Sequence, residues 1–245
     1  MEDLIVVLAC SQENLGLMPL YRQQLSNASI PVHVEHFTDF TNTLEDQIIG
    51  QRRIIERLSC RKVIFTDAFD VLFYGTKAEV LAKIPNDKVL MGAERINWPP
   101  MNPPVTDFPG NTLWRYSNGG LSAGTPQALL NWYDAIERHP QYPQWCKDFN
   151  QRLFNIMLYE QDSSTRLDER TELFYCLPNE TDELQFVEGR PLNTICGTKP
   201  NFIHANNPVS WNISATSELW KHLPFASGWR GDWRTARWND SGQPS

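Results

Sequence analysis

The sequence has no long hydrophobic segment. Its longest apolar run near the start, Leu4 to Cys10, is too short to cross a bilayer. Acidic rather than basic residues precede that run, which argues against a secretory signal. We therefore expect no membrane association and a cytoplasmic location, which is also compatible with a virus- or phage-encoded protein.

The sequence also lacks paired cysteines and an excess of basic residues. Its five cysteines are widely spaced, with no CxxC pair and no Cys/His spacing of a zinc site, so we expect free thiols in a reducing compartment. The net charge of −7 argues against broad, nonspecific binding to nucleic acid, which needs a basic surface. Neither a P-loop nor a GxGxxG motif is present, so no generic nucleotide-binding fingerprint applies.

The chain does contain apolar runs that alternate with segments of helical periodicity. This order predicts an α/β fold, with a mainly parallel central sheet flanked by helices in a single domain of residues 1–225. The expected strands are Leu4–Ala9, Pro31–Phe37, Val63–Phe65, Lys88–Ala93, Leu173–Leu177, Leu184–Val187 and Asn201–Ala205. The expected helices are Pro19–Ser26, Leu44–Leu58, Thr76–Ile84, Pro126–Arg138 and Phe149–Tyr159.

The most informative segment is the apolar strand Val63–Phe65, which ends in two acids, Asp67 and Asp70. Ligands of open α/β folds bind beyond the carboxyl ends of the strands. Two carboxylates at such an edge can share one divalent cation, and the cation can hold a diphosphate. The alternative is that Asp67 caps a helix and Asp70 is merely exposed.

A histidine and a glycine pair extend this hypothesis. His204 ends the apolar run Phe202-Ile203, and an imidazole with two carboxylates suits Mn²⁺, with Mg²⁺ as the alternative ion. Simple packing of His204 is the competing interpretation. The glycines of Ser117–Gly120 let the backbone approach a sugar or a diphosphate closely, and a tight turn without a binding role is the competing interpretation.

These segments together resemble a known family. The chain is similar, from about Leu4 to about Trp211, to the glycosyltransferase domain of the multifunctional collagen lysyl hydroxylases and their viral and bacterial relatives. The matching segments, in their shared order, are Thr66–Leu72, Ala93-Glu94, Trp98-Pro99, Ser117–Gly120, Leu153-Phe154, Leu158-Tyr159 and Ile203–Pro208. The resemblance implies a GT-A (Rossmann-like) fold and a metal-dependent transfer of a hexose-type sugar from a UDP-sugar to a hydroxyl acceptor.

The resemblance also implies roles for individual residues. By position, Asp67, Asp70 and His204 match the Mn²⁺ ligands of the family. Further residues match positions that bind the donor: Phe69 stacks on uracil, Arg52 contacts phosphate, Trp98 lines the sugar pocket, and Asn118 hydrogen-bonds the sugar, with Gly119, Gly120 and Asn206 beside them.

The sequence departs from the family at its catalytic acids. The family has a run of aspartates just before the Leu-Phe helix, whereas this chain has Asp148, Asn150 and Gln151 in that segment. We take these three residues as the catalytic candidates, although an amide cannot act as a general base and can only orient a sugar or stabilise charge.

Two alternatives follow. Residues 226–245 form a tail in which tryptophans alternate with arginines, expected to be partly disordered at its end, and such a tail either binds single-stranded nucleic acid or packs onto the domain. The expected acceptor is a hydroxyl of a glycan, a protein or a modified DNA base. The first alternative is a glycosyltransferase of phage or protist type that acts on hydroxymethylated bases in DNA. The amides at Asn150 and Gln151 motivate the second alternative, a nucleotide-sugar-binding protein without transferase activity.

Overall fold

The computed structural model describes residues 1–10, 16–36, 43–100, 112–177 and 183–205. These residues form a six-stranded sheet, a three-stranded sheet and a two-stranded sheet. The strands are β1 (Glu2–Cys10), β2 (Val32–His36), β3 (Cys60–Asp67), β4 (Val71–Phe73), β5 (Val89–Glu94), β6 (Tyr116–Gly124), β7 (Thr165–Leu167), β8 (Phe174–Cys176), β9 (Leu184–Val187), β10 (Arg190–Asn193) and β11 (Phe202–His204). The helices are α1 (Met18–Asn27), α2 (Leu44–Arg57), α3 (Lys77–Lys83), α4 (Pro126–Arg138), α5 (Tyr142–Trp145) and α6 (Asn150–Tyr159).

The six-stranded sheet has the order β2-β1-β3-β6-β5-β7 and is mostly parallel. Strand β1 is parallel to β2 and β3, and β5 is parallel to β7, while β6 runs antiparallel to its neighbours β3 and β5. This arrangement confirms the predicted α/β architecture.

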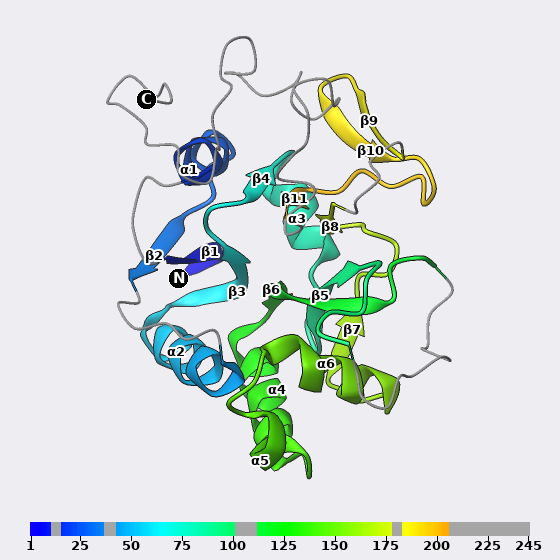
Figure 1. The fold of residues 1–245 in the computed structure, drawn as a ribbon. Helices are drawn as coiled ribbons and strands as arrows, with labels where there is room; N and C mark the ends of the chain where they lie inside the picture. The colour runs from blue at the N-terminus through cyan, green and yellow to red at the C-terminus, as the bar shows by residue number, and fades with distance from the viewer. Residues whose placement is uncertain (11–15, 37–42, 101–111, 178–182, 206–245) are drawn as a thin grey trace.

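Helices cover both faces of the sheet (Figure 1). Val6 and Leu8 of β1 pack in one hydrophobic cluster with residues of α1 and α3. Ile5 and Val7 of the same strand pack in a second cluster with residues of α2, α4 and α6. Successive side chains of a strand point to opposite faces, so a run that is apolar at every position is buried on both sides, as the sequence predicts for β1 and β3.

Local sequence signals explain where the helices begin. Thr76 and Glu79 form the predicted capping box of α3. The side chains of Thr43 and Thr125 accept hydrogen bonds from the backbone at the starts of α2 and α4, and Pro126 stands in the first turn of α4. The short elements β4, β7, β10 and α5 carry no comparable signal and were not predicted separately.

One interpretation of the glycine-rich segment is wrong. Residues 117–120 do not form a turn but lie within strand β6. Asn118 pairs with Gly92 and Ser122 pairs with the adjacent Met91, so the chain from Gly119 to Leu121 bulges out of the β5 ladder. The glycine pair therefore serves a β-bulge, a feature that is over-represented next to active sites.

Further predictions concern the cysteines, membrane-spanning helices and the C-terminal tail. All five cysteines are free, and Cys10, Cys60 and Cys176 are buried. Within the described ranges, no helix is both long and apolar enough to cross a membrane. The tail of residues 226–245 and the boundary at residue 225 lie outside the described residues.

Candidate active site at the carboxyl edge of the sheet

Two sheets meet where Asp67, Asp70 and His204 lie. Asp67 is the last residue of β3, and Asp70 precedes β4. Strand β11 pairs antiparallel with β4, so that His204 stands opposite Val71, and the backbone N–H of Ala205 donates to the carbonyl of Asp70 at 2.8 Å. This pairing brings a histidine from the end of the chain to the acids of β3.

The three side chains converge on one point. One ligand atom from each lies within 4.8 Å of the others. His204 Nε2 is 3.2 Å from Asp67 Oδ2 and 3.3 Å from Asp70 Oδ1. Nevertheless, the buried atoms His204 Nε2 and Asp70 Oδ1 have no hydrogen-bond partner among the described residues. Buried polar atoms without partners that face one point fit a site for a cation.

Electrostatics support the same interpretation. Burial raises the pKa of the Asp70 carboxyl above its ordinary value, although His204 beside it acts in the opposite direction. Burial alone would lower the pKa of His204, but the carboxylates of Asp70 and Asp67 raise it well above its ordinary value. Perturbed, clustered ionisable groups of this kind are typical of functional sites.

Asn118 of β6 fixes the orientation of His204. Its Oδ1 lies 3.1 Å from His204 Nδ1 and accepts a hydrogen bond from the backbone N–H of Gly120 at 3.1 Å. Because that N–H can only donate, the amide atom facing the imidazole is the oxygen, and Nδ1 must carry the proton. Nε2 is then the nitrogen that faces the two carboxylates. It carries a proton while the raised pKa keeps the ring an imidazolium, and it becomes a ligand atom when a cation displaces that proton. Asn118 is buried, and its predicted contact with a sugar stays a prediction.

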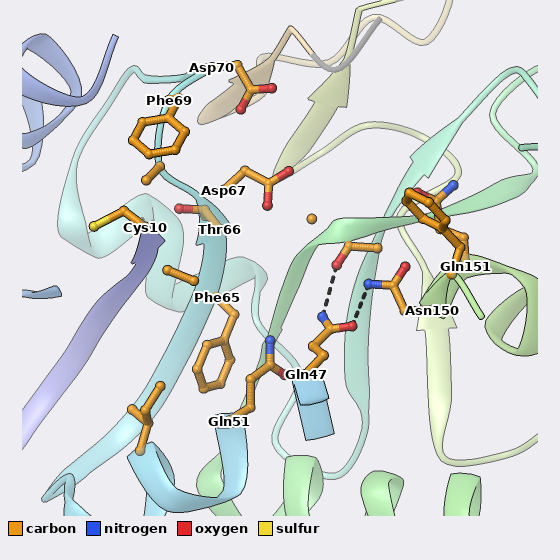
Figure 2. A pocket seen from close by; sticks show the side chains of 16 residues that line it. Cys10, Gln47, Gln51, Phe65, Thr66, Asp67, Phe69, Asp70, Asn150 and Gln151 are labelled. Carbon is orange, nitrogen blue, oxygen red and sulfur yellow. Dashed lines mark hydrogen bonds between the residues drawn. The ribbon is translucent and has the colours of Figure 1, made fainter. Parts of the chain in front are cut away.

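A cavity of about 410 Å³ opens beside the three ligands (Figure 2). Its volume lies within the usual range for small-molecule sites. Asp67, Asp70 and Phe69 line one part of it, and Gly119 and Gly120 of the β6 bulge line another. Among the described residues that line it there is no lysine or arginine.

Amide side chains form the wall opposite the acids. Gln47 of α2 accepts a hydrogen bond from Asn150 Nδ2 and donates to the carbonyl of Gly119 at 3.2 Å, as Figure 2 shows. Gln151 Nε2 donates to the carboxylate of Glu94 and, at 2.8 Å, to the carbonyl of Trp98. The wall is therefore uncharged at its surface and suited to hydroxyl groups.

The structure separates the three catalytic candidates. Asn150 and Gln151 line the cavity, and Asp148 does not. The Asp148 carboxylate instead binds Arg152 at 2.8 Å and accepts from the backbone N–H of Phe149 at 2.7 Å. Asp148 thus stabilises the start of α6 and does not face the metal ligands.

The predicted donor-binding residues differ in where they lie relative to the cavity. Phe69 lines the cavity, and the N–H of Leu17 holds its carbonyl at 2.7 Å. Trp98 is exposed and presents its carbonyl to Gln151. Asn206 lies outside the described residues.

Arg52 is not brought to the cavity. Its guanidinium binds Asp134 and Glu137 of α4, at 2.7 Å each, and the described part of the chain places it outside the pocket lining. Two carboxylates on the neighbouring helix hold its guanidinium, and the phosphate contact expected for it stays a prediction.

Two residues near the site were not predicted. Glu94, at the end of β5, is buried against Gln151 and, at 3.4 Å, the amide of Asn118. Gln51 lines the cavity one position before Arg52. Glu94 could have been found from the sequence, because it is an acid at the end of an apolar strand, as Asp67 is. Gln51 could not, because an uncharged residue on an amphipathic helix does not stand out as a site residue.

Comparison with known proteins gives the family. A family model described as "PLOD GT domain" matches residues 55–222. The chain belongs to the PLOD GT domain family. The match includes both acids after β3, the bulged strand β6 and His204, so the family's region contains the whole candidate metal site.

Two individual proteins are similar to this PLOD GT domain. It is 30% identical over 162 residues to procollagen-lysine,2-oxoglutarate 5-dioxygenase 2 of Mus musculus, a match that covers 60% of this chain and 20% of that protein. The chain thus matches about a fifth of the length of that relative. Its fold is similar to the crystal structure of a glycosyltransferase involved in the glycosylation of the major capsid of PBCV-1, with a TM-score of 0.52, 9% identity, and 85% of this chain and 96% of that chain covered. This likeness agrees with the GT-A fold that the resemblance implied.

Proposed function

We propose that this glycosyltransferase-family protein transfers a hexose-type sugar from a UDP-sugar to a hydroxyl acceptor and requires a divalent cation, with Mn²⁺ preferred over Mg²⁺. The observation that carries the proposal is the convergence of Asp67, Asp70 and His204 beside a cavity that no lysine or arginine of the described residues lines. A diphosphate brings at least two negative charges into that cavity, and a divalent cation held by these three ligands would offset them.

Different residues would bind the cation, orient the histidine and contact the donor sugar. Asp67, Asp70 and His204 would hold the cation, which when bound supplies Lewis-acid stabilisation to the leaving diphosphate. Asn118 accepts from Nδ1 of His204 and so directs Nε2 at the site, where Nε2 would give up its proton to bind the cation. Gly119 and Gly120 let the backbone come close to the donor, and Asn150 and Gln151 would orient sugar hydroxyls.

The test is release of UDP from a panel of UDP-hexoses, with Mn²⁺, with Mg²⁺ and with a chelator. We expect slow, Mn²⁺-dependent hydrolysis of one donor and faster release when glycan, peptide or hydroxymethylated-DNA acceptors supply a hydroxyl. UDP release that is unchanged by the chelator would contradict the metal requirement. An absence of UDP binding would contradict the proposal as a whole.

A second candidate function rests on the amide wall. The amides of Asn150 and Gln151 cannot remove a proton from an acceptor, which favours a protein that binds a nucleotide sugar without transferring it. Tight, Mn²⁺-dependent UDP-sugar binding with neither hydrolysis nor transfer across the acceptor panel would support this function. Any catalytic release of UDP would exclude it.

Replacing Asn118 with alanine tests the positioning of the histidine. The change removes the acceptor of the His204 Nδ1–H, and we expect Mn²⁺ affinity to fall about 10- to 100-fold, as is usual when a partner of a metal-binding histidine is lost. Calorimetric titration of Mn²⁺ measures this directly.

The matched control is Asn155→Ala. Asn155 is an equally buried amide that binds the backbone and hydroxyl of Ser117 on the same strand, but it does not contact His204. We expect this variant to lose stability and to keep its Mn²⁺ affinity. Equal losses of affinity in both variants would show that Asn118 acts only through general packing.

A further inference from the structure

The amide of Gln51 is held in one orientation at the floor of the cavity. Its Oε1 accepts a hydrogen bond from the hydroxyl of Tyr133 on α4. The amide nitrogen is turned toward the cavity (Figure 2) and has no hydrogen-bond partner among the described residues. A donor that is fixed in place and has no partner among the described residues is a feature of a recognition site.

Tyr133 is itself constrained. It is fully buried between α2 and α4, and burial raises the pKa of its hydroxyl well above the ordinary value, so the group stays protonated and donates. The guanidinium of Arg52 lies over its ring, 5.6 Å from the centroid, and is anchored by Asp134 and Glu137. Arg52 therefore contributes to the site by supporting Tyr133, not by reaching the cavity.

We propose that Gln51 reads the base of the donor nucleotide by donating from Nε2 to a carbonyl oxygen on the base edge, with Tyr133 as the residue that fixes the amide. This proposal deepens the proposed function and rests on it. Gln51 is a specificity-determining residue, and Tyr133 is a positioning residue.

Apolar side chains share the cavity with Gln51, and they indicate which part of the donor it meets. Ala9, Ile54 and Phe65 line the cavity together with it, and these side chains are apolar. A flat base with one or two polar edge atoms fits such walls, whereas a hexose needs hydrogen bonds on several sides. The polar wall of Asn150 and Gln151 suits the hexose. The metal site lies at the same cavity, so the diphosphate would join the two parts.

The orientation of the amide predicts discrimination between pyrimidines. Uracil has a carbonyl at position 4, where cytosine has an amino group. The Nε2 of Gln51 donates to the first and meets another donor in the second. With Tyr133 holding Oε1, the amide cannot turn over to accept from cytosine, so two donors are left facing each other and unpaired.

The experiment compares dissociation constants of UDP and CDP in the presence of Mn²⁺, measured by calorimetry on the full chain. For the wild type we expect UDP to bind about tenfold more tightly than CDP. In Gln51→Leu, UDP binding weakens and the preference falls to near unity. In Tyr133→Phe, the amide is free to turn over, so CDP binding improves and the preference falls about threefold.

The control is Tyr175→Phe. Tyr175 is a buried tyrosine whose hydroxyl binds Glu183 at 3.2 Å, and it does not line the cavity. The Tyr175→Phe variant loses a buried tyrosine hydrogen bond of the same kind as Tyr133→Phe does, and we expect its UDP preference to stay at the wild-type value.

Two outcomes would overturn the role of Gln51. In the first, the wild type binds CDP as well as UDP; in the second, Gln51→Leu and Tyr133→Phe both keep the full preference. In either case Mn²⁺-dependent UDP binding would still support the proposed function. If the wild type binds neither nucleotide, the proposed function fails, and the role of Gln51 fails with it.

Discussion

Replacing Asp70 with asparagine is expected to abolish Mn²⁺-dependent turnover, lowering UDP release by about a thousandfold, or about 4 kcal/mol of transition-state stabilisation. Asp70 is the most buried carboxylate of the metal site, and its Oδ1 has no hydrogen-bond partner among the described residues. Asparagine keeps the size of the side chain and removes the charge that the cation needs. The measurement is UDP release from the preferred donor at saturating Mn²⁺.

Thermal unfolding separates loss of the metal site from loss of the fold. We expect Mn²⁺ to raise the Tm of the wild type, because a ligand that binds only the folded protein stabilises it, and not to raise that of Asp70→Asn. Without Mn²⁺ the variant should keep a Tm near that of the wild type, because it loses both the burial cost of the Asp70 carboxylate and the attraction between that carboxylate and His204.

Asp162→Asn serves as the control for this variant. Among the described residues, the Asp162 carboxylate binds the backbone and hydroxyl of Ser164 in a turn before β7, so its loss should leave Mn²⁺ stabilisation intact. Full turnover in Asp70→Asn, or the same gain in Tm with Mn²⁺ as in the wild type, would remove Asp70 from the metal site.

The half of the metal site that comes from β3 could be predicted from local sequence. A run that is apolar at every position needs cover on both faces, and the acids that follow it must then lie at the edge of the sheet. The same kind of local signal predicted α2, α3, α4 and α6 to within a few residues, because caps and apolar periodicity are encoded near each helix end.

The other half of the site depends on long-range pairing. His204 reaches Asp70 because β11 pairs with β4, two strands of three residues each, and short strands carry little pattern. Adjacent glycines are typical of a turn, and from the sequence alone the glycines of β6 are interpreted as one. Strands β3 and β5 flank β6 in the sheet, and the local sequence does not show that pairing. Gln51 and Tyr133 carry no charge and belong to no recognisable sequence motif. Their hydrogen bond follows from the packing of α2 against α4, which the sequence alone does not predict.

Replacing Gly120 with alanine is expected to lower Mn²⁺ affinity and turnover about a hundredfold while leaving the fold intact. A Cβ at this position would lie 2.3 Å from Asp67 Oδ2 and 3.0 Å from His204 Cε1. The Asp67 side chain is half exposed and can rotate outward to relieve the contact, so the cost to folding is small. The rotated carboxylate, however, no longer faces His204, and the cation loses a ligand.

Gly124→Ala, on the same strand, distinguishes a metal effect from a strand effect. A Cβ at Gly124 would meet nothing closer than the carbonyl of Lys88 at 3.4 Å, which is an ordinary contact. We expect this variant to bind Mn²⁺ and release UDP like the wild type, and both variants to unfold near the wild-type Tm. If Gly120→Ala binds Mn²⁺ normally, Asp67 is not required as a ligand, and the bulge in β6 serves the donor alone. If it loses Mn²⁺ at an unchanged Tm, the missing side chain at Gly120 is what allows a strand of the central sheet to pass directly beneath the metal ligands.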